Sequence, residues 1–84
     1  MSGENDLEQI LATALAHHGS GQLDLAEAGY RDVLRRDPQE PDALNLLGLV
    51  LQDRGNLDES IALIKRALDI VPDFPEALVN LARV

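Results

Sequence analysis

Apolar and polar residues are distributed along this chain with the spacing of amphipathic helices. In the first segment Leu7, Ile10, Leu11, Ala14 and Leu15 recur at helical intervals, so they lie on one face of a helix. Similar spacing returns in the later segments of the chain. The pattern predicts five helices, which run from Leu7 to near Gly19, from about Asp24 to Arg36, from Pro41 to the turn at Asp53, from about Asp58 to Ile70, and from Pro75 to Val84.

Proline residues mark where several of these helices begin and end. Pro41 and Pro75 suit the first position of a helix, where the missing N–H is no loss. Pro38 and Pro72 end the helices before them, because the residue preceding a proline is driven out of the helical region. The connections are short, so neighbouring helices are expected to pack antiparallel.

The pattern repeats with a period of 34 residues. Residues 75–82 (PEALVNLA) repeat residues 41–48 (PDALNLLG), and Pro38 precedes Pro72 by the same interval. A fixed period of this size is typical of a solenoid built from stacked helix pairs. We therefore expect a disordered tail over residues 1–6 and a helical domain over residues 7–84, divided into repeat one (7–40), repeat two (41–74) and a partial repeat three (75–84).

The helix pairs resemble the tetratricopeptide repeat, in which large, small and aromatic positions follow in fixed order before a closing proline. The resemblance covers residues 7–84 and implies an all-α fold, a right-handed α-solenoid of antiparallel helix pairs with five helices. Small residues at fixed positions let two helix backbones approach closely, so Ala26 and Gly48 are expected to be buried. The residues that carry the resemblance are Ile10, Leu44 and Leu78; Leu47-Gly48 and Leu81-Ala82; Ala26 and Ser60; Tyr30 and Ile64; and Pro38 and Pro72.

The chain departs from the family pattern at both ends. Gly29 stands inside a helix, where glycine costs about 0.5–1 kcal/mol relative to alanine. The third repeat lacks its second helix, so we expect Leu78, Leu81 and Ala82 to cover the fourth helix and to leave an apolar face open. Either the chain is a piece of a longer solenoid, or that face meets another chain.

The composition narrows the classes of partner and of chemistry. The formal net charge of −8 disfavours nucleic acid as a partner; it favours a basic protein or peptide, or serves only solubility. The sequence has no cysteine, so it has no disulfide and no thiolate metal site. It shows neither a membrane span nor a basic, apolar leader, so no membrane association and a cytoplasmic location are expected.

The sequence offers no catalytic or cofactor-binding constellation. His17 and His18 are adjacent in a helix and therefore about 100° apart around its axis. We interpret His17 as a half-buried residue between helices and His18 as a solvated one, rather than as a base or a metal ligand. No phosphate-binding glycine loop, metal-ligand pair or nucleophile motif is found. The chain is therefore expected not to be an enzyme, with no cofactor and no metal.

The resemblance also implies a binding surface, because in this family the first helix of each pair lines a concave groove that binds peptides. Leu11, Leu15, Leu46, Glu76 and Asn80 stand where some members carry the Lys, Asn and Arg residues that bind a chaperone's C-terminal carboxylate. That type of binding is therefore not expected. Asn80 is similar to asparagines that hold peptide backbone in other repeats of the family. The expected groove residues are Glu8, Leu11, Leu15, Asp42, Asn45, Leu46, Leu49, Glu76, Val79, Asn80 and Arg83.

The carboxylates of Glu8, Asp42 and Glu76 recur at one position of the repeat and allow two interpretations. They could receive Lys or Arg from a peptide, or they could stabilise their helices as acids in the first turn, by about 0.3–1 kcal/mol each. The main functional hypothesis is a protein–protein interaction module, part of a longer protein, that binds a segment in the groove. The alternative is a self-association element that forms a weak homodimer through its open C-terminal end.

Overall fold

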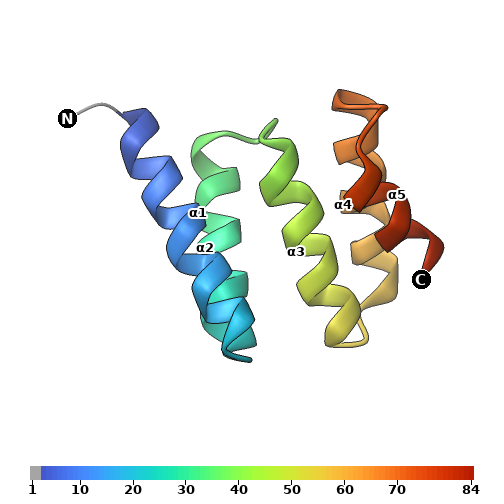
Figure 1. Ribbon diagram of the computed structural model, residues 1–84, viewed down its shortest axis with the longest axis horizontal. Helices are drawn as coiled ribbons and strands as arrows, with labels where there is room; N and C mark the ends of the chain where they lie inside the picture. Colours follow the sequence, from blue (N-terminus) through green and yellow to red (C-terminus); the bar gives the residue numbers. More distant parts are fainter. Residues whose placement is uncertain (1–2) are drawn as a thin grey trace.

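The structure, a computed structural model, describes the backbone of residues 3–84 and the side chains from residue 6 onward. This part of the chain is all-α and contains five helices, joined by short connections (Figure 1). The all-α solenoid predicted from the sequence is confirmed. The helices are α1 (Gly3–Gly19), α2 (Leu23–Arg36), α3 (Pro41–Asp53), α4 (Leu57–Ile70) and α5 (Pro75–Ala82).

The helix boundaries differ from the predicted ones mainly at the two ends of the chain. Helix α1 begins at Gly3, so residues 3–6 belong to it rather than to the tail predicted over residues 1–6. Residues 1–2 of that predicted tail lie outside the described residues. At the other end, α5 stops at Ala82 and not at Val84.

Two turns, 34 positions apart, reverse the chain in the same way. Gly21 has a φ of +79° and Gly55 a φ of +82°, in the left-handed region that glycine adopts without a steric cost. In each turn the amide of the next residue donates to a carbonyl five positions back, from Gln22 to His17 at 2.9 Å and from Asn56 to Leu51 at 2.8 Å. This pattern is the Schellman motif, which satisfies carbonyls at a helix end.

The two connections that contain proline cap the helices after them in different ways. The Glu40 carboxylate accepts a hydrogen bond from the Ala43 amide at 2.7 Å and so caps α3, whose first residue is Pro41. Burial raises the pKa of Glu40 even though this hydrogen bond favours the charged form. Phe74 holds the cap position of α5 without a side-chain hydrogen bond to the helix, and Pro75 follows it.

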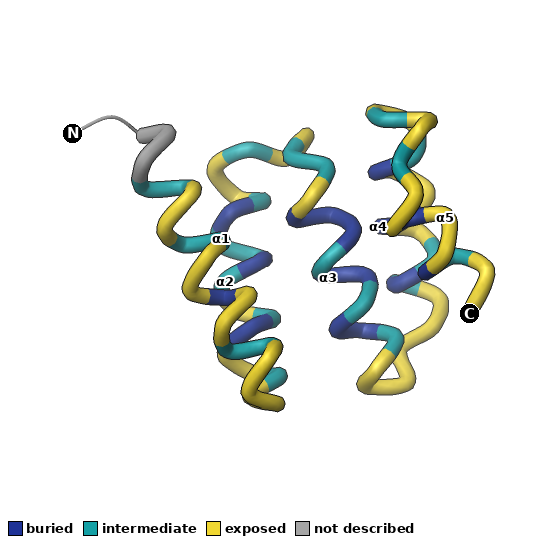
Figure 2. The backbone as a smooth tube through the Cα atoms, viewed as in Figure 1, coloured by how far each residue is buried: buried dark blue, intermediate teal, exposed yellow. Residues whose placement is uncertain are grey.

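The helices stack in chain order, and α3 lies at the centre of the stack. Each helix packs against the next one, and α5 also packs against α3. In the view of Figure 1, α1 lies in front of α2 and α5 in front of α4. Figure 2 shows the buried residues of α3 along its whole length, which fits its contacts with α2, α4 and α5. None of the described helices is long and apolar enough to cross a membrane.

The buried core is aliphatic with one aromatic residue, Tyr30. Its largest fully buried side chain is Tyr30, and partly buried apolar side chains, Phe74 among them, pack around it. Burial raises the pKa of the Tyr30 phenol to about 12. The buried core residues that pack together are Ala14, Ala26, Tyr30, Leu44, Leu47, Val50, Leu51, Leu63 and Ala67.

Small residues sit where paired helices come closest, as predicted for Ala26 and Gly48, which are both buried. A Cβ atom on Gly48 would lie 2.6 Å from Cγ1 of Ile64, so no side chain fits there without a shift. The Ser60 hydroxyl donates to the Gly48 carbonyl at 2.6 Å across the same contact.

Gly29 corrects an expectation. A Cβ atom on this residue would lie 2.6 Å from the Cβ of Ala14, so glycine lets α2 approach α1 closely. The expectation that alanine would be more stable than glycine at this position is therefore wrong, because it considered only helix propensity and not the contact with α1.

Helix α5 turns a different face toward its neighbours than the sequence predicted. Ala77 is fully buried and Asn80 is 7% exposed, whereas Leu78 is 49% exposed and Ala82 is also exposed. Of the three residues expected to cover α4, only Leu81 is even half-buried. The reason is that α5 also packs against α3, which turns Ala77 and Asn80 inward and Leu78 toward the open side.

Candidate functional site

A hollow of about 490 Å³ lies across the first helices of the three repeats. Its walls come from α1, α3 and the start of α5, which the 34-residue period brings to equivalent places in the stack. We call this hollow the groove. Its lining residues are Glu8, Leu11, Ala12, Leu15, Asp42, Asn45, Leu46, Phe74 and Glu76.

The centre of the groove is apolar and partly open to solvent. Leu11, Leu46 and Phe74 are half-buried, and Leu15 is 50% exposed. Half-buried leucines beside an aromatic ring leave apolar surface that a partner side chain can cover. Because the surface is already assembled by the helix packing, a partner would meet it without rearranging the fold.

Phe74 is the groove residue that the sequence reasoning missed. It occupies the cap position of α5, directly before Pro75, and its ring reaches into the groove and packs against the core. The corresponding residue of the preceding repeat is Glu40, whose carboxylate caps α3 instead. The position before a helix-opening proline is no signal for the groove, because Glu40 holds it in repeat two without lining the groove.

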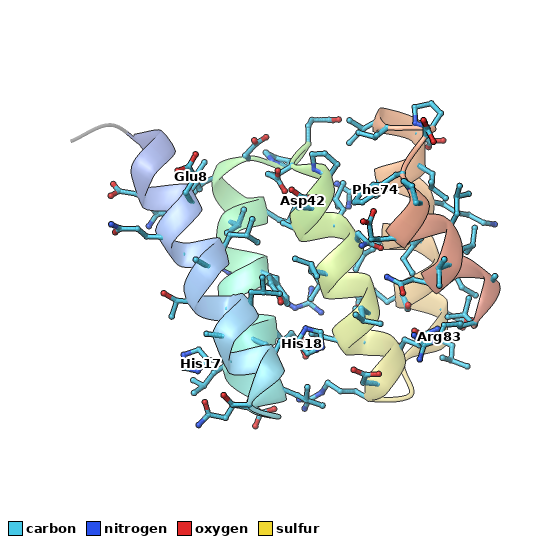
Figure 3. The ribbon with its side chains drawn as sticks, in the orientation of Figure 1. Glu8, His17, His18, Asp42, Phe74 and Arg83 are labelled. Atoms are coloured by element: carbon cyan, nitrogen blue, oxygen red, sulfur yellow. The ribbon has the colours of Figure 1, made fainter. Side chains whose placement is uncertain are left out.

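Three carboxylates stand at the groove. Glu8, Asp42 and Glu76 are all exposed, and Asp42 and Glu76 lie in the first turns of their helices. Figure 3 shows Glu8, Asp42 and Phe74 at the same end of the molecule. Among the described side chains none of the three carboxylates takes part in an ion pair. We call these three residues the acidic rim.

Two asparagines join α3 to α5 beside the groove. The Asn80 amide Nδ2 donates to Oδ1 of Asn45 at 3.0 Å, and both side chains are buried. The Gln52 amide donates to the Asn80 carbonyl at 3.3 Å, while its own Oε1 is buried without a partner. These amide groups hydrogen-bond within the fold and hold α5 against α3. They therefore have fewer donors and acceptors left for a ligand.

The structure brings together seven of the eleven residues expected in the groove, namely Glu8, Leu11, Leu15, Asp42, Asn45, Leu46 and Glu76. The other four lie outside its lining. Leu49 is half-buried, Val79 is 58% exposed and Asn80 is buried against Asn45. Arg83 caps the C-terminal end of α5, whereas Phe74 caps its N-terminal end (Figure 3).

The opposite side of the molecule carries a network of ion pairs. Arg31 of α2 donates two hydrogen bonds to Glu59 of α4, at 3.1 and 3.3 Å, and one to Glu27 at 2.9 Å. The hydrogen bond to Glu59 is the main cause that raises the pKa of Arg31 above its usual value. Arg54 reaches Asp24 at 2.6 Å. These contacts tie repeat one to repeat two.

His17 is half-buried beside α2, as expected, but His18 is half-buried too and not solvated. His18 lies between helices: Nδ1 is 3.2 Å from the Tyr30 hydroxyl and Nε2 is 3.5 Å from the Asp53 carboxylate. His17 pairs at 2.8 Å with the exposed Gln22 side chain. With Nε2–H donating to Asp53, Nδ1 can accept from the Tyr30 hydroxyl, so this cluster links α1, α2 and α3.

A second hollow, of about 510 Å³, lies between α1 and α2 and is lined by Ile10, Thr13, His17 and Leu25 among others. The residues 34 positions after the first three are Leu44, Leu47 and Leu51, all of them buried in α3, which packs against α2. Thr13 and His17 are thus polar substitutes on a face that is core in repeat two. This hollow is the more polar of the two faces and does not contain the expected groove residues.

Comparison with known proteins finds a matching family and a similar sequence. A family model described as "Tetratricopeptide repeat" matches residues 11–75, more than half of the chain. The chain is also similar to "Cellulose synthase operon protein C" of Pseudomonas fluorescens (strain SBW25). These two sequences are 56% identical over 43 residues, which are 51% of this chain and only 3% of that protein.

Proposed function

The chain belongs to the tetratricopeptide repeat family, and from this membership we propose that its groove is the surface on which it binds a segment of another protein. Repeats of this family generally mediate protein–protein interactions and act as scaffolds rather than as catalysts. The relative from Pseudomonas fluorescens carries the name of a cellulose synthase operon protein, but the matched stretch is 3% of it. Because the matched stretch is so small, this relative's name is not extended to the chain, and the proposal rests on membership of the repeat family.

The observation that carries the proposal is the exposed apolar surface inside the groove. Leu15 is 50% exposed, next to the half-buried Leu11, Leu46 and Phe74. Most exposed apolar side chains in a small protein are scattered, whereas these gather in one hollow between three helices. A side chain inserted there would lose contact with water on several sides, which is the main source of affinity in such sites.

The proposal can be tested with a phage-displayed library of random dodecapeptides, selected on the immobilised 84-residue chain. We expect enrichment of peptides that the Leu15→Asp variant no longer retains. Leu15 is a sharper probe than Leu49, because Leu49 lies outside the lining of the groove. Leu25→Asp is the matched control, since Leu25 is also 50% exposed but lies on α2 outside the groove.

Circular dichroism of both variants checks that the helices remain formed. Equal retention of peptides by the chain and by Leu15→Asp would contradict the proposal. Loss of helicity in Leu15→Asp alone would also contradict it, because it would make Leu15 a structural residue and not a recognition residue.

A second candidate function, self-association, is favoured by apolar side chains exposed at the C-terminal end. Leu78 is 49% exposed, Val79 58% and Val84 36%. A second copy could cover this face, and two-fold pairing is the commonest arrangement of identical subunits. The area is small, so the dimer would be weak and concentration-dependent.

A further inference from the structure

We infer that the groove selects protein segments in which an apolar side chain is flanked by Lys or Arg; the inference rests on the groove being the binding surface proposed above. Two separate features of the molecule support it: the distribution of charge between the two layers of helices, and the lack of internal partners for the acidic rim.

Most of the positive charge lies on one side of the fold. Helices α1, α3 and α5, which form the groove, contain no Lys or Arg within their bounds. Of the seven Lys and Arg residues in the chain, two are cap residues, Arg54 after α3 and Arg83 after α5. The remaining five lie on α2 and α4, behind the groove: Arg31, Arg35, Arg36, Lys65 and Arg66.

The cap cations do not neutralise the groove. Arg54 is held by Asp24 at 2.6 Å, on the side of α2. Arg83 caps the end of α5 that is farther from Phe74 and Glu76, and it is not among the residues that line the groove (Figure 3). The charged residues that line the groove are therefore all carboxylates, and the concave shape of the site strengthens their field.

The acidic rim is free to bind because its carboxylates have no partner within the described part of the fold. Other acids are in ion pairs with arginines, such as Glu59 with Arg31 and Asp32 with Arg35. Glu8, Asp42 and Glu76 are exposed and outside all of these pairs. Their negative charges would attract cations on an incoming segment and repel an acidic one.

Neither the acidic rim nor the apolar centre of the groove is sufficient alone to select such a segment. Exposed ion pairs contribute little affinity, because the charges stay hydrated and are screened by salt. The apolar centre formed by Leu11, Leu15, Leu46 and Phe74 supplies the burial, and the acidic rim decides which apolar segments enter. The occupant is thus a cationic segment with an apolar anchor, and not a basic tract without one.

The composition of the selected dodecapeptides tests this chemistry. Among the peptides retained by the chain but not by Leu15→Asp, we expect Lys and Arg to be enriched on both sides of a Leu, Phe or similar residue. Peptides with an apolar residue but without a bias in charge would leave the groove as a binding site and overturn the inference. If no peptide depends on Leu15, the proposed function fails together with it.

The strongest selected peptide then serves as the probe in titrations by fluorescence anisotropy. We expect its affinity to fall about tenfold or more in the variant Glu8→Gln, Asp42→Asn, Glu76→Gln, and to fall with salt as the charges are screened. The matched control is Asp58→Asn, Asp69→Asn, Asp73→Asn, which removes the same number of negative charges from exposed residues outside the groove. An equal loss in both variants would assign the effect to net charge and overturn the inference.

Discussion

At the scale of single residues, the close contacts between helices depend on the absence of side-chain atoms. In the second helix pair the space beside Gly48 is filled by Ile64, and in the first pair the space beside Gly29 is filled by Ala14. The glycine is on the first helix in one pair and on the second helix in the other. What the fold requires is therefore one small partner for each contact, on either side of it.

We predict that Gly48→Leu lowers the free energy of unfolding by about 1–3 kcal/mol, because the new side chain would overlap Ile64. Gly19→Leu is the control, since nothing lies within 4 Å of a Cβ atom placed on Gly19. Thermal unfolding followed by circular dichroism measures both. A melting temperature of Gly48→Leu equal to that of the parent chain would remove the packing role assigned to Gly48.

Tyr30 gives the molecule a dependence on alkaline pH. Its pKa is about 12 in the folded chain, against about 10 for an exposed phenol in the unfolded chain. The neutral phenol is therefore favoured by folding, and its contribution to stability is complete below pH 10. As the pH rises from about 10 to about 12, the unfolded chain releases the proton first and stability falls.

This prediction is accessible because Tyr30 is the only tyrosine and the chain has no tryptophan. The ultraviolet absorbance of the phenolate should titrate near pH 12 in the native protein and near pH 10 in concentrated guanidinium chloride. A native midpoint near 10, with the helices still formed, would show that the phenol is hydrated in solution.

At the scale of elements, α5 depends on its neighbours more than the other helices do. It has eight residues, fewer than the roughly 12–15 that an isolated helix needs to persist in water. It is held by the buried Ala77, by the hydrogen bond from Asn80 to Asn45, and by the bond from Gln52 to the Asn80 carbonyl. Helices α3 and α4 bury apolar side chains along much of their length and lack this dependence.

We therefore predict that Asn80→Ala loosens α5 without unfolding the rest of the chain. The change leaves Oδ1 of Asn45 without its donor inside a buried contact, which costs about 1–3 kcal/mol. Hydrogen exchange of the α5 amides should become about tenfold faster or more, while α3 and α4 keep their protection. Val79→Ala is the control, because Val79 is 58% exposed; unchanged exchange in Asn80→Ala would contradict the prediction.

At the scale of the whole molecule, the two sides and the two ends differ in chemistry. Cations and ion pairs lie on the side of α2 and α4, and unpaired carboxylates lie around the groove. One end of the stack carries Thr13 and His17 where repeat two has leucine, whereas the other end exposes Leu78. The C-terminal end is thus the more apolar of the two.

This difference leads to a prediction for the oligomeric state. Sedimentation over a wide concentration range should show a weak dimer that Leu78→Lys abolishes, because a buried lysine would lose its hydration. Leu57→Lys is the control, since Leu57 is 45% exposed and lies at the start of α4. A strict monomer at millimolar protein concentration would exclude self-association through this end.

The sequence by itself determined the helices and their order. Pro41 and Pro75 mark the first residues of α3 and α5, and glycines at positions 21 and 55 make the turns between paired helices. These signals lie in the conformational preferences of neighbouring residues, so they can be read without knowledge of distant contacts. The groove residues were expected from the resemblance to the tetratricopeptide repeat, and seven of them line one hollow, since equivalent helices of stacked repeats align.

Only the tertiary structure decided how α5 is rotated, that Phe74 enters the groove, and that His18 as well as His17 lies between helices. It also paired Asn80 with Asn45, which are 35 positions apart and therefore not equivalent in the repeat. The physical reason is that each of these features depends on which side chains from distant segments fill the space beside a helix. Such contacts are set by the packing of all five helices together, whereas the helical pattern of one segment fixes only which of its faces is apolar.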